Sequence, residues 1–410
     1  MFKTNIINSI IHTFLEVLLS FNALFFKKIA KGVEGRKKSF NKLKTSFSKN
    51  DKIIHIHCSS YGEYLMSEEL TANLKKNFTD YKFLLSFISP SGYENANKSL
   101  FDCVIYLPLS SNTNLKKFYG LISPKITLFI KNEIWPGYIN YAKMYGSKVY
   151  SVGGNFKNSF FKKRASFFSS AIKKLDGVFV SNKSSKNIIE QIGNENVFIC
   201  GDLRYDNIIP NLNEVQEKII SEFINNKKCI VFGSTWAEDE RLILKYINES
   251  KRDLKYIIAP HEIGENCNRI KQRIEKKSIL FSKIKSAQIK QNFSCLIVDN
   301  IGMLSSLYSY CTLAYVGGGM GTAGLHNTLE PASFAKPIII GKNYKRFDEA
   351  IVMIKNGGMI SISSYDEFYN SIEKILTDKA KFNKMSNSNA DHFKKQKGAI
   401  KQILKHMKKK

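Results

Sequence analysis

Short apolar runs alternate with amphipathic helical patterns along two long stretches of the chain. In the first stretch the runs lie at residues 52–58, 81–88, 103–109, 126–130, 148–154 and 177–182. In the second stretch they lie at residues 228–235, 254–261, 294–299, 313–319 and 337–341. Near-continuous apolar runs separated by helices are typical of parallel strands buried on both faces. The pattern therefore predicts an α/β fold with two doubly wound, Rossmann-like domains.

The alternation pauses near Asn207–Asn213 and then restarts. We therefore predict an N-terminal domain over residues 31–209 and a C-terminal domain over 210–385. Residues 1–30 are predicted as a separate helix, and 386–410 as a basic helix or tail. Two such domains are expected to face a cleft, where ligands of doubly wound folds usually bind.

The N-terminal segment has the pattern of an amphipathic helix. Residues 5–26 place Phe14 and Leu18 on a broad apolar stripe and His12 and Glu16 on the opposite one. We expect a membrane anchor that either lies in the interface or crosses the bilayer once. A signal peptide fits poorly, because the charged residues follow the apolar run. A core helix of a soluble domain is the alternative.

Charge adds a second indication of a membrane surface. The 410 residues include 63 Lys and Arg against 35 Asp and Glu, which gives a net charge of +28. Just over half of this excess lies in residues 27–52 and 391–410. Such segments attract anionic lipid or nucleic acid, and the preceding apolar helix favours lipid. Seven scattered cysteines without a CxxC pair indicate a reducing compartment rather than a disulfide framework.

Several polar residues directly follow predicted strands, where ligands bind in parallel α/β sheets. They are Glu63, Glu133 and Arg204 in the first half and His261, Asn327 and Glu330 in the second. Each has a structural alternative, such as an acid favoured by the helix dipole or an N-cap. Their shared placement at strand ends in both halves favours a binding or catalytic site.

Residues 319–324 match GxGxxG, but the next strand, 337–341, ends without the acid that a dinucleotide site requires. We therefore favour a loop that approaches a phosphate or carboxylate of a sugar donor. His55 and His57 share one face of a strand without visible partner ligands, so no metal site is predicted.

These motifs resemble the 3-deoxy-D-manno-octulosonic acid (Kdo) transferases of lipopolysaccharide biosynthesis. The resemblance rests on the blocks HCSSYGE, SPSGYE, KNEIWP, CGDLRYD, FGSTWAEDE, APHE, and GGGMGTAGLHNTLEPA followed by PIIIGKNYKRFDEA. It implies a GT-B glycosyltransferase fold, with an acceptor domain followed by a CMP-sugar donor domain. It also implies that no cofactor and no metal is used.

The resemblance assigns roles to individual residues. Glu63 corresponds to the general base, and Glu133 and Arg204 to further catalytic positions. The implied acceptor-binding residues are Ser60, Gly62 and Ser91. The implied donor-binding residues are Ser234, Pro260, His261, Gly302, Met303, Leu304, Gly324, Asn327, Thr328, Leu329 and Glu330. Lys131 stands where the family usually has a glutamate, and whether it replaces a catalytic glutamate is left open.

The implied reaction is the inverting transfer of Kdo from CMP-Kdo to a hydroxyl of the tetraacyl, bisphosphorylated lipid A precursor. The implied location is the cytoplasmic face of the bacterial inner membrane, with anionic lipids as partners and no nucleic acid. Two alternatives stay open. One is another GT-B transferase that acts on a membrane lipid, and the other is a non-catalytic basic protein that binds membranes or polyanions.

Overall fold

The structure is a computed structural model that describes residues 27–157, 165–208, 212–284 and 292–408. The chain folds into two compact units. Unit 1 comprises the described residues up to Asn207 together with those from Lys397 onward. Unit 2 runs from Ile208 to Gln396.

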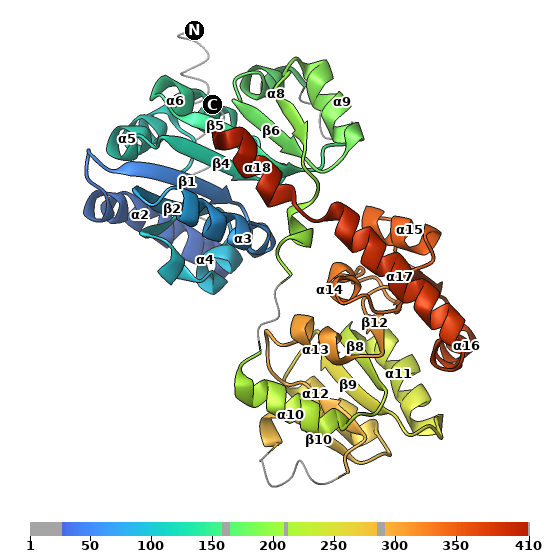
Figure 1. Ribbon diagram of the computed structural model, residues 1–410. Coiled ribbons are helices and arrows are strands. Elements are labelled where there is room, and N and C mark those ends of the chain that lie inside the picture. Colours follow the sequence, from blue (N-terminus) through green and yellow to red (C-terminus); the bar gives the residue numbers. More distant parts are fainter. Residues whose placement is uncertain (1–26, 158–164, 209–211, 285–291, 409–410) are drawn as a thin grey trace. The chain divides into compact units, whose positions relative to one another are not determined.

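Unit 1 contains a seven-stranded parallel sheet in the order β3-β2-β1-β4-β5-β6-β7 (Figure 1). The strands are β1 (Lys52–Cys58), β2 (Tyr81–Phe87), β3 (Cys103–Tyr106), β4 (Ile126–Ile130), β5 (Lys148–Gly154), β6 (Gly177–Val180) and β7 (Val197–Ile199). The strand order reverses between β1 and β4. Ligands of doubly wound sheets bind at such a reversal, beside the carboxyl ends of the strands.

Helices cover both faces of this sheet. They are α2 (Lys27–Ser46), α3 (Tyr61–Asn77), α4 (Pro90–Asn95), α5 (Asn112–Ile122), α6 (Pro136–Met144), α8 (Ala165–Ile172), α9 (Lys183–Ile192) and α18 (Ala399–Lys408), with single 3₁₀ turns η1 (Lys98–Leu100) and η2 (Leu203–Tyr205). One buried cluster joins the sheet to α2, α5, α6, α8 and α9, and the other joins it to α3 and α18.

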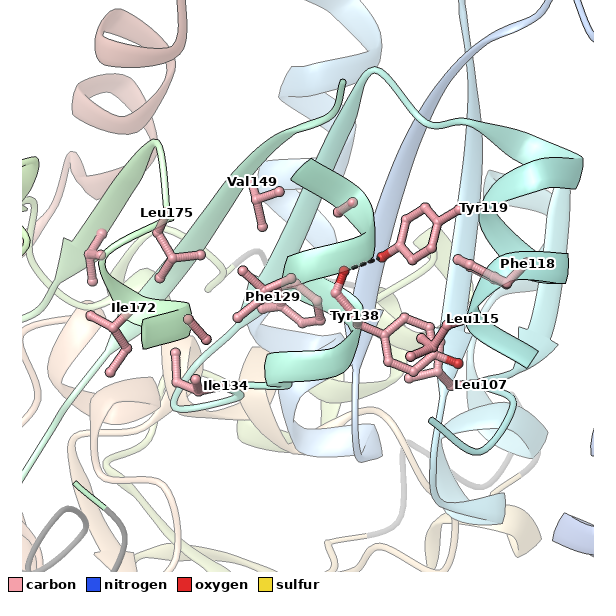
Figure 2. Close-up of a cluster of buried hydrophobic side chains, with 14 of the residues drawn as sticks. Leu107, Leu115, Phe118, Tyr119, Phe129, Ile134, Tyr138, Val149, Ile172 and Leu175 are labelled. Atoms are coloured by element: carbon pink, nitrogen blue, oxygen red, sulfur yellow. Dashed lines mark hydrogen bonds between the residues drawn. The ribbon is translucent and has the colours of Figure 1, made fainter. Parts of the chain in front are cut away.

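Figure 2 shows the first cluster, in which the Tyr119 hydroxyl donates to the Tyr138 carbonyl at 2.8 Å. Alternate β1 residues enter opposite clusters, because side chains of a strand alternate between its faces.

The basic helix α2 is docked rather than free. Arg36 donates from Nε to the Leu107 carbonyl and from Nη2 to the Ile88 carbonyl, both at 3.3 Å. Ser39 donates to the Tyr106 carbonyl at 2.8 Å. These bonds satisfy carbonyls at the ends of β2 and β3, and they leave the helix lysines on the outer side.

The C-terminal segment, treated above as one basic helix or tail over 386–410, is divided between two helices. α17 ends at Gln396 in unit 2, and α18 packs on unit 1, where Ile400, Ile403 and Met407 are buried (Figure 1). The Asp206 carboxylate accepts from the backbone N–H groups of Gly398 at 2.7 Å and Ile400 at 2.8 Å. An apolar stripe at helical spacing, combined with this N-terminal cap, explains why a lysine-rich segment folds here.

Unit 2 repeats the same architecture. Its seven-stranded parallel sheet has the order β10-β11-β9-β8-β12-β13-β14, with the reversal between β8 and β12. The strands are β8 (Cys229–Thr235), β9 (Lys255–Pro260), β10 (Ser278–Leu280), β11 (Cys295–Ile297), β12 (Leu313–Val316), β13 (Ile338–Gly341) and β14 (Met359–Ile362). The helices are α10 (Glu214–Ile224), α11 (Ala237–Glu249), α12 (Glu265–Arg273), α13 (Leu304–Tyr310), α14 (Leu329–Ser333), α15 (Asp348–Lys355), α16 (Tyr365–Thr377) and α17 (Lys379–Gln396), with the 3₁₀ turn η3 (Phe281–Lys283).

The predicted pair of doubly wound α/β domains is confirmed. The sequence analysis missed three short edge strands, β7, β10 and β14, whose three or four residues carry little periodic signal. It also extended several strands too far, since the run predicted at 313–319 ends as a strand at Val316. The remaining residues of such runs are loops at the carboxyl edge of the sheet.

The predicted N-terminal anchor falls almost entirely on residues 1–26, which lie outside the described residues. Within the part of the chain that the structure describes, no helix has the length and apolar character needed to cross a bilayer.

Candidate active site

Residues predicted from the sequence gather at the strand reversal of each unit. In unit 1, Glu63 follows β1, and Lys131 and Glu133 follow β4, its neighbour across the reversal. In unit 2, Ser234 is the last residue but one of β8, and the loop from Gly317 to Thr328 follows β12. Each sheet therefore brings its own set of polar residues to the position where such folds bind ligands.

Glu63 lies in the first turn of α3 and is 8% exposed. The Ser60 backbone N–H donates to its Oε2 at 3.0 Å, which fixes the carboxylate above the end of β1. Burial raises the pKa of Glu63, and the charge of Glu133 raises it further. The N–H groups of Ser60 and Ser59 and the charge of Lys131 act in the opposite direction. The result is a fixed carboxylate with an increased affinity for protons, as a general base requires.

Glu133 is half-buried and accepts a hydrogen bond from the Trp135 indole Nε1 at 2.6 Å. Burial raises the pKa of the Cys58 thiol at the end of β1, and the charges of Glu63 and Glu133 raise it further. The structure thus brings the two glutamates together beside one strand end. The charge of Glu133 favours the protonated form of Glu63, the more buried of the two carboxylates.

Lys131 has a left-handed backbone, with φ +66°, directly after β4. Its backbone N–H donates to the Val152 carbonyl at 2.7 Å, and its side chain is exposed. A non-glycine residue held at positive φ costs on the order of 1 kcal/mol, and such residues cluster at functional sites. Lys131 therefore adds a positive charge to the edge that carries the two glutamates.

The three residues predicted to bind the acceptor lie around the same loop. Ser60 precedes α3, and Gly62 is exposed, with no atom within 4 Å of the position that a Cβ would take. Ser91 exchanges a hydrogen bond with Ser89 at 2.8 Å, and the Ser89 backbone N–H donates to the Ser59 carbonyl at 2.9 Å. The start of α4 is thereby tied to the loop that carries Ser60.

Arg204 lies in η2 of unit 1 and is half-buried. Its guanidinium donates to Asp202 Oδ2 from Nε at 2.9 Å and from Nη2 at 2.7 Å. Asp202 also accepts from the Arg204 backbone N–H at 2.9 Å. The positive charge is therefore held in a fixed orientation by its own loop.

In unit 2, Asn327 and Glu330 form a bonded pair at the start of α14. Asn327 Nδ2 donates to Glu330 Oε1 at 3.1 Å, and Asn327 Oδ1 accepts from the Leu329 N–H at 3.1 Å. Burial raises the pKa of Glu330 to about 7. Between them lies the buried Thr328, whose hydroxyl has no hydrogen-bond partner among the described residues.

The other predicted donor residues also lie at the carboxyl edge of this sheet. Ser234 has φ +52°, and Pro260 ends β9 opposite Thr235, the next residue of β8. Gly302 and Met303 precede α13, whose first residue, Leu304, reaches the end of β8 at Gly233. Gly324, with φ +96°, ends the glycine loop.

The sequence analysis missed an aromatic stack in this unit. His261 lies 4.6 Å from Trp236 and 4.5 Å from His326, measured between ring centroids, with interplanar angles of 20° and 30°. Trp236 Nε1 donates to His326 Nε2 at 2.9 Å, so this nitrogen carries no proton. Burial lowers the pKa of His326 to about 4, which keeps it neutral. Stacked rings of this kind present a flat surface suited to hold a nucleobase.

A buried carboxylate joins the two loops that carry this stack. Asp239 accepts from the N–H groups of Trp236 at 2.9 Å and Gly318 at 2.8 Å, and from the Tyr315 hydroxyl at 2.6 Å. Asp239 lies in the first turn of α11 and was not predicted as a site residue. Close packing explains the adjacent glycine, because a Cβ at Gly318 would lie 2.1 Å from the Gly324 carbonyl.

No cluster of three or more His, Cys, Asp or Glu side chains suited to hold a metal occurs among the residues that the structure describes. His55 and His57 instead bond to Ser86, from Nε2 at 2.8 Å and from Nδ1 at 2.9 Å.

Comparisons with known proteins show which chains are similar to this one. Residues 34–207 match the profile of a family described as 3-deoxy-D-manno-octulosonic-acid transferase (kdotransferase). The chain is 28% identical to the 3-deoxy-D-manno-octulosonic acid transferase of Rickettsia bellii over 79% of each chain. For that of Aquifex aeolicus the identity is 28% over 79% of this chain and 86% of the relative. A bifunctional glycosyltransferase/methyltransferase of Fusobacterium nucleatum is 27% identical over 81% of this chain, and the match spans about half of that longer protein, 54%.

Solved structures support the fold. The UDP-GlcNAc 2-epimerase of Neisseria meningitidis matches 88% of this chain and 100% of its own, with a TM-score of 0.63 at 12% identity. A glycosyltransferase of Rickettsia africae matches 87% of this chain and 97% of its own, with a TM-score of 0.55 at 15% identity. The chain has the GT-B architecture and is similar to the 3-deoxy-D-manno-octulosonic acid transferases, both in the family profile and in relatives matched over most of its length, which identifies it as a glycosyltransferase.

Proposed function

We propose that this protein transfers Kdo from CMP-Kdo to a hydroxyl of the tetraacyl, bisphosphorylated lipid A precursor, with inversion at the anomeric carbon. The observation that carries the proposal is the environment of the Glu63 carboxylate. It is a buried carboxylate, fixed by backbone N–H groups, whose pKa is raised by burial and by Glu133. The family relatives support Kdo as the transferred sugar.

In the proposed step, Glu63 takes the proton of the acceptor hydroxyl as its oxygen attacks the anomeric carbon of Kdo. The bond between that carbon and the phosphate oxygen breaks on the opposite side, and CMP leaves with the electron pair. The negative charge of Glu133 favours both the proton on Glu63 and positive charge at the anomeric carbon. Arg204 supplies positive charge for the departing phosphate.

In this proposal unit 2 holds the donor. The stack of Trp236, His261 and His326 offers a flat surface to the cytosine base. Asn327 and Glu330 offer hydrogen-bonding groups to the ribose diol. These residues act by binding and orientation, so the donor is presented with its anomeric carbon accessible.

We also propose that the protein works at the cytoplasmic face of the bacterial inner membrane. α2 exposes Lys31, Lys37, Lys38, Lys42 and Lys44. Exposed lysines beside a bilayer attract anionic lipid and the phosphates of the acceptor, each contributing about 1 kcal/mol near the surface. Flotation with vesicles that contain or lack anionic lipid tests this location, and equal binding to both would contradict it.

The test of function is mass spectrometry of the lipid product from purified protein, acceptor and freshly generated CMP-Kdo. A mass increase of one or more Kdo units is expected. UDP-glucose, UDP-GlcNAc and CMP-sialic acid serve as competing donors. Transfer from one of these, with CMP-Kdo left unconsumed, would favour another GT-B transferase and contradict the proposal.

A further inference from the structure

Two fully buried histidines stand on β1, in the strand that leads to the Glu63 loop. His55 and His57 point to the same face of the sheet, and both have an exposure of 0%. Ser86, also at 0%, pairs with His57 on the neighbouring strand β2. Its hydroxyl bonds to both rings, at 2.8 Å to His55 Nε2 and at 2.9 Å to His57 Nδ1.

The unpaired nitrogen of His55 indicates where the proton of that ring lies. His55 Nδ1 has no hydrogen-bond partner among the described residues. A buried ring nitrogen without a proton is less costly to leave unpaired than a buried N–H. We therefore assign the His55 proton to Nε2, which donates to Ser86. On its other side Ser86 Oγ bonds to His57 Nδ1 at 2.9 Å, and His57 Nε2 bonds to the Ser59 hydroxyl at 3.3 Å.

His57 contacts the supports of both glutamates. Through Nε2 it bonds to Ser59, whose backbone N–H lies beside the Glu63 carboxylate. Its ring meets the Trp135 ring edge to face, with centroids 6.0 Å apart and an interplanar angle of 88°. Trp135 in turn donates to Glu133 at 2.6 Å. One side chain therefore touches the loop after β1 and the loop after β4.

We propose that His57 is a positioning residue that fixes the Glu63 loop and the Trp135–Glu133 pair relative to each other. The proposal rests on the proposed function, in which these carboxylates serve the transfer step. His57 does not exchange protons with substrate, because burial lowers its pKa to about 3 and keeps the ring neutral. Its contribution is the geometry of the pair, and small displacements of such groups reduce rates strongly.

His55 provides a matched control on the same strand. It has the same burial and also bonds to Ser86, but apart from His57, at 6.5 Å, its ring contacts Phe118, at 5.4 Å in the core drawn in Figure 2. His57→Phe and His55→Phe each replace a buried neutral ring with a phenyl ring. A role in packing alone would make the two variants behave alike.

For His57→Phe we expect a decrease in kcat of about 10²-fold with an unchanged donor KM. The acid limb of the pH profile should also move, because Glu63 is faced by the charged groups Glu133 and Lys131, whose placement would change. His55→Phe should lower the unfolding midpoint and leave kcat and the pH profile unchanged. His57→Gln, whose amide reaches toward Ser59, should recover part of the lost kcat. Equal effects of the two phenylalanine variants on kcat would overturn the proposal.

A second measurement does not depend on the substrate. The chain has two tryptophans, so a protein labelled with ¹⁵N-tryptophan gives two indole N–H signals, which Trp236→Phe assigns. His57→Phe should shift the Trp135 signal, and His55→Phe should leave it in place. An unmoved Trp135 signal in His57→Phe would contradict the proposal even if the wild-type protein transfers a different sugar. Failure of the wild-type protein to use CMP-Kdo, with the Trp135 shift present, would contradict the proposed function alone.

Discussion

The Trp135 indole N–H donates to Glu133 at 2.6 Å, within the loop that follows β4. A hydrogen bond to a charged acceptor favours the ionised form of that acceptor. Glu63, which lies deeper, has its pKa raised by burial and by the Glu133 charge. Two carboxylates in different environments can thus serve different roles at one site.

Replacing each tryptophan with phenylalanine should separate the role of unit 1 from that of unit 2. Trp135→Phe removes the hydrogen bond to Glu133, which is worth about 1.5–3 kcal/mol, and should lower kcat by roughly 10- to 100-fold. Trp236→Phe keeps a ring against His261 but loses the bond to His326, and should mainly raise the donor KM. Steady-state kinetics with varied CMP-Kdo checks both. A reversed pattern would refute this division of roles.

Asp239→Asn should destabilise unit 2 and weaken donor binding. The asparagine amide group cannot accept from all of Trp236, Gly318 and Tyr315, so at least one buried donor loses its partner. We expect a loss of about 1–3 kcal/mol in the free energy of unfolding, measured by urea denaturation. CMP affinity, measured by calorimetry, should fall as well. Glu214→Gln, an exposed first-turn acid of α10, is the control and should change neither quantity.

Glu330 should make unit 2 less stable as the pH rises. The folded protein keeps the Glu330 proton up to about pH 7, whereas the unfolded chain releases it near the ordinary value of 4.5. Between these values the folded state binds more protons, so stability falls with rising pH. Glu330→Gln removes this component, on the order of 2 kcal/mol. Thermal unfolding at pH 5 and pH 8 should show that the midpoint of the variant rises relative to that of the wild type at the higher pH. The same pH dependence of the unfolding midpoint in both proteins would contradict the raised pKa.

Asp206→Ala should loosen α18 from unit 1. The variant loses the acceptor for the N–H groups of Gly398 and Ile400, at a cost of about 1 kcal/mol. Limited trypsin digestion should then cleave faster near Lys397, while Asp391→Ala, an exposed residue of α17, should digest like the wild type. Unchanged cleavage in Asp206→Ala would show that the apolar face of α18 holds the helix without this cap.

Much of the fold follows from local pattern. Buried parallel strands such as β4 and β12 read as continuous apolar runs, and the acid or glycine residues at their ends mark the start of each loop. The short edge strand β7 has a half-exposed, three-residue pattern that no period reveals. The predicted extension of the strand run at 103–109 failed because apolar residues beyond Tyr106 stay buried as a loop, as Leu107 shows.

The site was predictable only where chemistry is local. Glu63 caps its own helix, and Glu133 and Trp135 are two residues apart, so the motifs locate them. The bond between Trp236 and His326 joins positions 90 residues apart, and only the folded sheet reveals it. The same holds for His57, whose partner Ser86 lies on another strand. The sequence indicated two histidines on one face of a strand, but it did not indicate which residues they contact.

The central claim is that Glu63 is the general base of Kdo transfer. A base of this kind contributes about 10²–10⁴-fold, so Glu63→Gln should lose at least that factor in lipid product per minute, measured by mass spectrometry. The free energy of unfolding and the affinity for CMP should match the wild type, and Glu68→Gln on the same helix should remain active. Wild-type rates of product formation in Glu63→Gln would contradict the account.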